Sequence, residues 1–295
     1  MFEKVSKMHP DKIADRIAGA IVDYAYSLRE NPRCAVEVLI GHKACNIIIE
    51  TTVAMESEAI KEIVDRIAGQ QDYYNIYIHP QDKHLSDNQG LGFRCGDNGI
   101  FVGYPINEEE RLLTRIAGVL GTSDGKYIID TICADMYHII ICQSNKSRKQ
   151  VRSEIFETLM RERVHICDIN PIGSWTGGLS VDSGATNRKL GSDMGRAVTG
   201  GGLHGKDFTK ADVTLNIMCH ILAQEFGHIV KTKCAIGDEC IRFKNEDGRI
   251  IRTRPYNECV EEAKAWLIGN HGGFEGFAEY GLIAPHNRNI RVTLK

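Results

Sequence analysis

A repeated order of predicted elements limits the possible folds of this chain more than any other feature. Two strand-like runs, 34–41 and 45–52, meet at a short turn and are followed by an amphipathic helix over about 56–68. Two strands and a helix recur in the same order over 126–161 and again over 228–268. The three copies share almost no sequence identity, so the pattern alone predicts an internal threefold repeat of a strand-strand-helix unit.

The predicted strands carry apolar residues on both of their faces. The runs 47–49 and 137–142 are examples. Helices can cover one face of each sheet, so the other face needs a second cover. We therefore predict an α+β fold of three pseudo-repeated strand-strand-helix domains, with their sheets packed at a homodimer interface.

Three further helices are predicted outside the repeats. Apolar residues recur with helical spacing over 10–28, and Pro10 suits the first helical position. Asn107, with Glu110 three residues later, is typical of a side-chain N-cap and predicts a helix over about 107–120. A third helix is expected over about 207–226, with Gly227 at its end.

Composition and charge exclude several classes of protein. The 295 residues are 42% hydrophobic and 25% charged, which is typical of a soluble globular chain with a sizeable core. The net charge is only −3, so no broad field favours a nucleic acid or a membrane surface, and a site for anions must be local. No run of about 18 apolar residues occurs, which argues against a membrane-spanning helix.

The ten cysteines are scattered, and no C-x-x-C pair or signal peptide accompanies them. Most lie in apolar runs, where a free cysteine behaves as a small hydrophobic residue. We therefore expect reduced thiols in a cytoplasmic protein, and metal or redox roles are the less favoured alternative.

The segment 173–205 is rich in glycine and is the first candidate for a ligand site. The stretch GGGLHGKDFTKAD, over 200–212, contains four glycines that free the backbone, and two lysines and two aspartates follow them. The spacing is not that of a Walker A loop, because Lys206 is followed by Asp207. The pattern alone leaves an ordinary glycine-rich turn as the alternative.

The start of the helix predicted over 10–28 is a second candidate. His9, Asp11 and Lys12 fall on or beside its first turn, where unpaired amides and the helix dipole favour an anion. Simple capping by Ser6 or Asp11 is the alternative for this turn.

Four groups of residues occur in a fixed order: HPDK over 9–12, GDNG over 96–99, DSGATNRK over 182–189 and the glycine stretch 200–212. In this order they resemble the motifs of the methionine adenosyltransferase (S-adenosylmethionine synthetase) family. That family's first motif, V-S-x-x-H-P-D-K-I-A-D, is similar to 5–15. Its G-D-x-G, D-x-G-x-T-x-R-K and GGG…GKD-x-x-K-x-D motifs also match.

The resemblance implies three pseudo-repeated domains and a dimer with active sites at its interface, in agreement with the repeat predicted from the pattern. Whether such dimers pair into tetramers is left open. The implied domains are interleaved: an N-terminal repeat domain of 1–7 and 107–176, a central one of 8–80 and 177–214, and a C-terminal one of 81–106 and 215–295.

The activity implied by the resemblance is the synthesis of S-adenosylmethionine from ATP and L-methionine. The methionine sulfur attacks C5′ of ATP, and the triphosphate leaves and is hydrolysed to pyrophosphate and phosphate. A thioether is already a nucleophile, so no general base is needed. Because the leaving group is highly charged, protein cations and two Mg²⁺ ions are expected to supply much of the rate, and K⁺ is a further implied cofactor.

Residue roles follow from the matching motifs. Among the ATP-binding residues, Trp175 takes the place of an aromatic ring that stacks on adenine, and core packing of that ring is the alternative. Catalytic roles are implied for His9, Lys126, Arg188, Lys206 and Lys210. The implied ATP-binding set is His9, Lys126, Trp175, Asp182, Arg188, Lys189, Lys206 and Lys210.

The resemblance also implies methionine-binding residues and metal ligands. Asp11 and Asp212 are expected to bind Mg²⁺, for which carboxylate oxygens are suitable ligands, and Glu37 to bind K⁺. Exposed strand charges are the alternative for Glu37 and Glu50. The implied methionine-binding set is Glu50, Gln89, Asp97, Asp182 and Lys210.

The chain departs from the family pattern in several places. Most of the loop expected within 89–96 is missing, and that loop covers the family's active site, so we expect slower turnover or a different mode of closure. Met8 replaces a glycine, Ile48 and Ile49 replace a glycine pair, and the loop 200–206 is one residue short. These changes fall near the methionine and triphosphate subsites.

Two alternatives to the active enzyme follow from these departures. A degenerate member would bind nucleotide, or act as a structural partner of a full-length enzyme, without turnover. A protein that only hydrolyses triphosphate is the other alternative. The many charged site residues that the chain retains favour the active enzyme.

Overall fold

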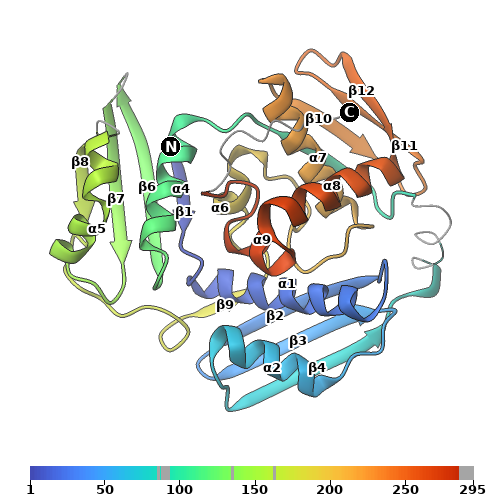
Figure 1. Ribbon diagram of the computed structural model, residues 1–295, viewed down its shortest axis with the longest axis horizontal. Coiled ribbons are helices and arrows are strands. Elements are labelled where there is room, and N and C mark those ends of the chain that lie inside the picture. The colour runs from blue at the N-terminus through green and yellow to red at the C-terminus, as the bar shows by residue number, and fades with distance from the viewer. Residues whose placement is uncertain (85–86, 88–93, 134–135, 162–163, 286–295) are drawn as a thin grey trace.

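Three four-stranded sheets form the framework of the computed structural model, which describes residues 1–84, 87, 94–133, 136–161 and 164–285. Figure 1 shows the sheets spread around a central group of helices that includes α1 (Pro10–Leu28) and α9 (Phe274–Tyr280). Every sheet combines a hairpin with strands from other parts of the chain. The α+β class predicted from the sequence is therefore confirmed.

The first hairpin forms the centre of a sheet that α1 and α2 (Ser57–Ala68) cover on one face. Alternate residues of its strands are buried against these helices, because successive side chains of a strand point to opposite faces. The outward positions include Glu37, Leu39 and Ile48, which are exposed. In spatial order, the strands are β4 (Tyr73–Pro80), β3 (Ala44–Thr51), β2 (Cys34–Gly41) and β9 (Ser183–Ala185).

The second hairpin lies in a sheet whose inner face packs on α4 (Glu108–Leu120) and α5 (Arg148–Arg161). The side chain of Asn107 accepts a hydrogen bond from the N–H of Glu110, whose carboxylate accepts one from the N–H of Asn107. The predicted cap of α4 is therefore confirmed. In spatial order, the strands are β1 (Phe2–Val5), β6 (Gly125–Cys133), β7 (Met136–Gln143) and β8 (Val164–Ile169).

The third sheet has one strand more than the predicted repeat. The strands expected at 228–236 and 239–245 are present, but the turn at 246–248 leads into another strand before α8 (Tyr256–His271). This strand was missed because it is an edge strand with two arginines that ends at a proline, Pro255. In spatial order, the strands are β12 (Ile250–Pro255), β11 (Cys240–Lys244), β10 (Val230–Cys234) and β5 (Gly99–Gly103).

The helix α7 (Ala211–Phe226) contributes many residues to the largest hydrophobic core. It ends, as predicted, at Gly227, which has a left-handed backbone. Two short helices, α6 (Leu190–Met194) and η1 (Gly195–Ala197), precede it. None of the described helices is both long enough and apolar enough to cross a lipid bilayer.

A buried lysine fastens the first strand to the end of the described chain. The Nζ of Lys4 donates hydrogen bonds of 2.7 to 2.8 Å to three main-chain oxygens, those of Ser192, Tyr280 and Ile283. Burial lowers the pKa of Lys4 to about 7, and the negative charge of Asp193 opposes this shift.

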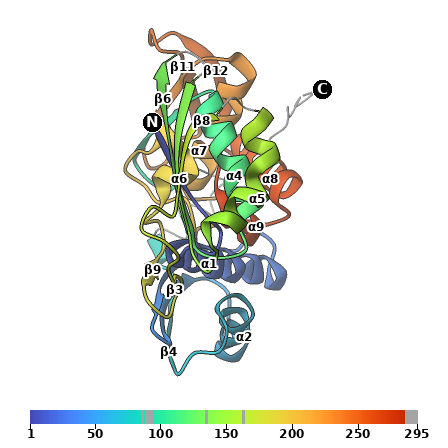
Figure 2. The same cartoon turned by 90° about the vertical axis from the view of Figure 1, so that its left-hand side faces the viewer.

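None of the described helices covers the outward faces of two of the sheets. Figure 2 shows the sheet of β6 to β8 nearly edge on, with α4 and α5 on one side only. Exposed apolar residues on these outward faces include Leu39, Ile48, Tyr77 and Ile166. A homodimer that buries these faces stays a prediction.

Candidate functional site

The first turn of α1 holds a neutral histidine. His9 is the N-cap of the helix, and its Nδ1 accepts a hydrogen bond of 3.2 Å from the N–H of Asp11. The alternative that Ser6 or Asp11 caps this turn is wrong. Burial lowers the pKa of His9 to about 4, against the opposing charge of Asp11, so the imidazole is neutral at pH 7. With Nδ1 as acceptor, the proton of the neutral ring lies on Nε2.

Asp11 brings two distant segments together. Its Oδ1 accepts a hydrogen bond of 2.9 Å from the N–H of Ala185. Arg188 Nη1 lies 3.5 Å from the same oxygen, and Lys189 Nζ lies 3.4 Å from Oδ2. Gly184 permits this approach, because an added Cβ would overlap the main-chain oxygen of Pro10. The 9–12 and 182–189 segments are therefore in direct contact.

Two further predicted site residues, Lys126 and Asp182, lie close enough to His9 for their charges to affect its pKa. The charges of Lys189, Asp182 and Lys126 all influence the pKa of His9, after its burial and the charge of Asp11. Lys126 Nζ also forms an ion pair of 2.9 Å with Glu3, and both side chains are partly exposed. We call the group of His9, Asp11, Lys126, Asp182, Arg188 and Lys189 the anion cluster.

Trp175 lies beside this cluster, next to a carboxylate that was not predicted. Asp124 Oδ2 accepts a hydrogen bond of 2.9 Å from the N–H of Gly178. A Cβ added at Gly177 would lie 2.6 Å from both Asp124 Oδ2 and Trp175 Cζ3, so the two side chains flank the same glycine. Burial raises the pKa of Asp124, and the charge of Asp182 adds to this shift. Its place two residues before Lys126 was the signal that could have identified it.

A cavity of 520 Å³ adjoins the anion cluster. Its wall includes Arg188 and Lys189 of the cluster, and charged residues of both signs complete it. Glu3, Glu109, Glu110 and Arg196 are the further charged lining residues.

Two glycines of the stretch 200–212 lie too close to neighbouring side chains to accommodate a Cβ. A Cβ added at Gly201 would overlap the carboxylate of Asp212, and one added at Gly202 would lie 2.7 Å from the side-chain nitrogen of Asn187. Asn187 also accepts hydrogen bonds of 2.9 and 2.8 Å from the N–H groups of Leu203 and His204. The stretch is therefore attached to the segment that carries Arg188 and Lys189.

The two lysines of this stretch have different partners. Lys206 Nζ lies 2.5 Å from Oδ2 of Asp212, and both side chains are partly exposed. Lys210 is the N-cap of α7, and its Nζ lies 2.5 Å from Oδ2 of the fully buried Asp207. Lys206 is thus paired with a predicted metal ligand, whereas Lys210 is paired with a structural carboxylate.

Glu37 and Glu50 lie on the outward face of the β4-β3-β2-β9 sheet. The side chain of Glu37 accepts a hydrogen bond from the hydroxyl of Thr186. Ala35 is opposite both Glu50 and Lys206 in the strand pairing, so these two side chains share this face. The exposed carboxylates therefore lie on the same surface as the lysine of the glycine stretch.

Asp97 and Gln89 are two further predicted methionine-binding residues. Asp97 is exposed on the loop before β5, and its Oδ1 accepts a hydrogen bond of 2.6 Å from the N–H of Asn98. Gln89 lies outside the described residues.

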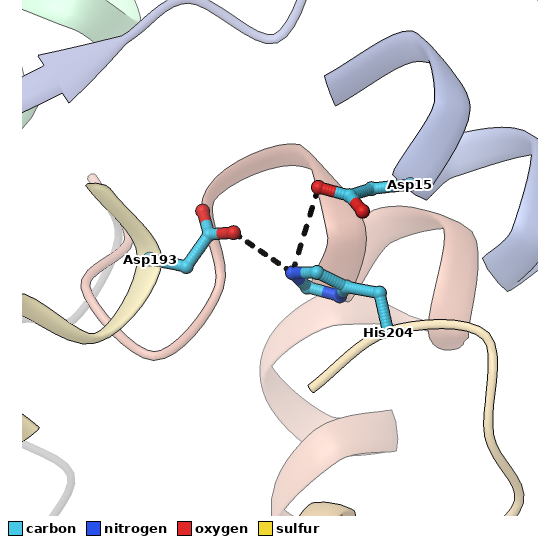
Figure 3. Close-up of side chains that lie close together, drawn as sticks. All are labelled: Asp15, Asp193 and His204. Atoms are coloured by element: carbon cyan, nitrogen blue, oxygen red, sulfur yellow. Dashed lines mark hydrogen bonds and ion pairs between the residues drawn. The ribbon is translucent and has the colours of Figure 1, made fainter. Parts of the chain in front are cut away.

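A buried ionic group that the sequence did not predict lies behind the glycine stretch. Figure 3 shows the side chains of Asp15, Asp193 and His204 close together. Their potential metal-ligand atoms lie within 4.8 Å of one another, and among the described residues no other such group of three is found. However, Lys12 Nζ lies 3.0 Å from Asp15, 2.5 Å from Asp193 and 3.3 Å from His204 Nε2. The ammonium of Lys12 therefore takes the position that a metal ion would need.

The opposite charges of this group stabilise each other's ionised forms. Burial opposes the charged form of Lys12, but the charges of Asp15 and Asp193 raise its pKa overall. Burial likewise opposes ionisation of Asp193, but the charge of Lys12 lowers its pKa overall. The group is an internal ion-pair network that joins α1, α6 and the glycine stretch. We call it the Lys12 network.

Comparisons with known proteins find relatives with one shared name. The family model described as "S-adenosylmethionine synthetase, N-terminal domain" matches residues 1–84. The chain is 28% identical over 268 residues to the S-adenosylmethionine synthase of Mycoplasmopsis pulmonis (strain UAB CTIP). This match covers 75% of this chain and 71% of that synthase. For the S-adenosylmethionine synthase of Acholeplasma laidlawii (strain PG-8A), the identity is 27% over 283 residues, with coverages of 76% and 73%. For that of Wolinella succinogenes, it is 30% over 263 residues, with coverages of 71% and 68%.

Proposed function

We propose, from the premise that this chain belongs to the S-adenosylmethionine synthase family, that it makes S-adenosylmethionine from ATP and L-methionine. In this reaction the methionine sulfur attacks C5′ of ATP, the bond from C5′ to oxygen breaks, and the triphosphate leaves. The triphosphate is then hydrolysed to pyrophosphate and phosphate.

The observation that supports this proposal most directly is the anion cluster. Arg188 and Lys189 lie beside Asp11 at the N-terminus of a helix, where main-chain N–H groups and the helix dipole already favour an anion. A cation about 4 Å from an anionic oxygen contributes about 4 kcal/mol at an effective dielectric of 20. Several such contacts would stabilise the charge that develops on the leaving triphosphate.

His9 would donate a hydrogen bond without transferring its proton. Its Nδ1 accepts a hydrogen bond from the N–H of Asp11, so Nε2 carries the ring hydrogen, which would bind the ligand. A neutral donor can bind the oxygen on C5′ as that oxygen becomes negative, without the proton transfer that a general acid would make. The thioether needs no base, so no second proton carrier is required.

Asp11 and Asp212 are the carboxylates that fit Mg²⁺. Both are hard oxygen ligands placed beside cations that bind phosphate, and Mg²⁺ commonly keeps water and substrate phosphate in its other positions. Bound there, Mg²⁺ would neutralise charge on the triphosphate. Glu37, with the hydroxyl of Thr186 beside it, offers oxygen ligands that suit K⁺.

The remaining substrate contacts are assigned by the same proposal. Trp175 would stack on adenine, and Lys126 would contact phosphate. The exposed Asp97 and Glu50 would hold methionine together with Asp182, Lys210 and Gln89.

We also propose that a homodimer completes the site. Glu37, Glu50 and Lys206 lie on an outward sheet face, and the anion cluster lies at the N-terminus of α1. A partner subunit that covers this face would bring further charged groups to the triphosphate. The three sheets also support the interleaved domains with bounds 1–7 and 107–176, 8–80 and 177–214, and 81–106 and 215–295. A cytoplasmic location belongs to the same proposal.

The test is a turnover assay with labelled methionine, ATP and Mg²⁺. The protein should form a labelled sulfonium product, and Lys206→Met should lower kcat/KM by roughly 10²-fold to 10³-fold. Lys61→Met is the matched control, because Lys61 only pairs with Glu58 on the surface of α2.

Two results would reject the synthase. Calorimetric binding of ATP and methionine without product would favour a degenerate nucleotide-binding or structural subunit. Phosphate release from triphosphate without any sulfonium product would leave a hydrolase.

A further inference from the structure

Two thiols lie beside the loop that carries Asp97. Cys95 comes two residues before Asp97 in the chain, and Cys234 is the last residue of β10, where it pairs with Gly99 of β5. Both cysteines are buried, although Cys234 keeps 8% of its surface exposed. They therefore lie directly beneath an exposed loop.

The two sulfur atoms share one acceptor. Cys95 Sγ lies 3.2 Å and Cys234 Sγ 3.3 Å from the main-chain oxygen of Asp97. Two sulfur atoms this close to one oxygen are near neighbours in the fold.

Main-chain hydrogen bonds hold both cysteines in this position. The N–H of Cys95 donates to the oxygen of Asp238, and the oxygen of Cys95 accepts from the N–H of Gly237, at 3.0 and 2.9 Å. The side chain of Asn98 accepts a hydrogen bond of 2.8 Å from the N–H of Ile236. The Asp97 loop and the turn after β10 therefore form one unit, with the thiols between them.

The two thiols differ in acidity. The hydrogen bond from Cys234 lowers the pKa of Cys95, and the same contact raises the pKa of Cys234. By contrast, burial raises the pKa of other thiols of the described residues, such as Cys219 and Cys259. Cys95 is thus the more readily ionised of the two thiols.

We propose that Cys95 and Cys234 form a reversible oxidation site, at which a small peroxide converts the two thiols into a disulfide. The Cys95 sulfur attacks one peroxide oxygen, the O–O bond breaks, and Cys95 becomes a sulfenic acid with release of water. The Cys234 sulfur then attacks that sulfur, the S–O bond breaks, and the thiol proton leaves with the hydroxyl as a second water. Two thiols and one hydrogen peroxide thus give one disulfide and two waters.

Oxidation would change the loop that presents Asp97. The disulfide removes both S–H donors from the main-chain oxygen of Asp97, so the loop loses two of the hydrogen bonds that hold it in place. This consequence rests on the proposed function, in which the Asp97 side chain binds methionine. We expect the KM for methionine to rise by about tenfold, since the loss of about one such hydrogen bond corresponds to that factor.

The experiment treats the whole protein with one equivalent of hydrogen peroxide, blocks the remaining thiols and maps the cysteines by mass spectrometry. The expected product is a peptide pair joined through Cys95 and Cys234 that dithiothreitol separates, together with a reversible rise in the methionine KM. Cys234→Ala should stop the reaction at the sulfenic acid of Cys95, which a dimedone label would detect. The matched control, Cys240→Ala, changes an exposed thiol and should leave the disulfide unaffected.

Oxidation of the exposed Cys133 and Cys240 without a bond between Cys95 and Cys234 would overturn the proposal. A disulfide that leaves the methionine KM unchanged would overturn its link to the Asp97 loop. If the reduced protein makes no sulfonium product, the proposed function fails, but the cysteine map still decides whether the oxidation site exists.

Discussion

The Nζ of Lys12 lies 2.5 Å from Oδ2 of Asp193, and neither side chain has any surface exposed to solvent. Asp15 and His204 complete the network around this pair. Four groups from three distant segments thus hold the back of the glycine stretch against α1.

Lys12→Met should destabilise the protein strongly. It leaves the buried carboxylates of Asp15 and Asp193 without their cation, and removal of one partner of a buried ion pair costs about 3–5 kcal/mol. Urea unfolding measures this cost. Lys61→Met, which removes an exposed pair with Glu58, should change the free energy of unfolding by less than about 1 kcal/mol. Equal effects of the two substitutions would contradict the importance of the Lys12 network.

Two neighbouring glycines should respond differently to alanine. A Cβ at Gly201 would overlap the carboxylate of Asp212, whereas one at Gly200 would meet no atom within 4 Å. The end of the Asp212 side chain can rotate away, so Gly201→Ala should spare the fold and disturb the pair of Lys206 and Asp212. A displacement of about 1 Å in a catalytic group can cost roughly 10²-fold in rate, so kcat/KM should fall by about that factor.

Gly200→Ala is the internal control for this experiment, and its kcat/KM should stay near that of the unmodified protein. If both variants lose activity equally, the close approach at Gly201 is not what positions Asp212.

His9 should contribute to the loss of stability in acid. Its pKa is lowered to about 4 in the folded protein and is about 6.5 when unfolded, so between these values the unfolded chain binds more protons. The contribution of His9 is complete above about pH 6.5 and is lost as the pH falls towards 4. His9→Asn, which keeps a capping side chain, should reduce the slope of unfolding free energy against pH in this window.

The exposed His42, replaced in the same way by asparagine, provides the comparison for His9. An unchanged slope in His9→Asn, measured by urea unfolding at several pH values, would show that the imidazole is not buried in its neutral form.

Asp11→Asn should separate metal binding from folding. The amide oxygen can still accept the hydrogen bond from the N–H of Ala185, so the turn should remain intact, but a neutral ligand binds Mg²⁺ poorly. We expect kcat/KM to fall by roughly 10²-fold to 10³-fold and the Mg²⁺ concentration for half-maximal rate to rise. Asp130→Asn, on the outward face of β6, serves as the control, and an unaltered Mg²⁺ dependence in Asp11→Asn would refute the assignment.

The sequence predicted those parts of the fold that depend on local patterns. Helical periodicity predicted α1 with Pro10 at its start, and the glycine after Phe226 predicted the end of α7. The strand β12 was missed, because in an edge strand with two arginines the alternation of buried and exposed residues is weak.

The prediction of the site rests on sequence motifs that resemble those of a known family. The motif around His9 and the motif around Arg188 were assigned to one site, and Asp11 does join them. The Lys12 network was not predicted, because its members become neighbours only when α1, α6 and the glycine stretch meet. The spacing of Asp124 and Lys126 could have drawn attention to Asp124, but its position beside Trp175 depends on the packing of Gly177.

The contacts of Lys4 have a consequence for the order in which the chain acquires its structure. The three oxygens that bind its ammonium lie 188, 276 and 279 residues further along the chain. During synthesis two of these partners leave the ribosome 276 and 279 residues after Lys4. β1 is therefore expected to reach its final contacts only after α9 and Ile283 have been made.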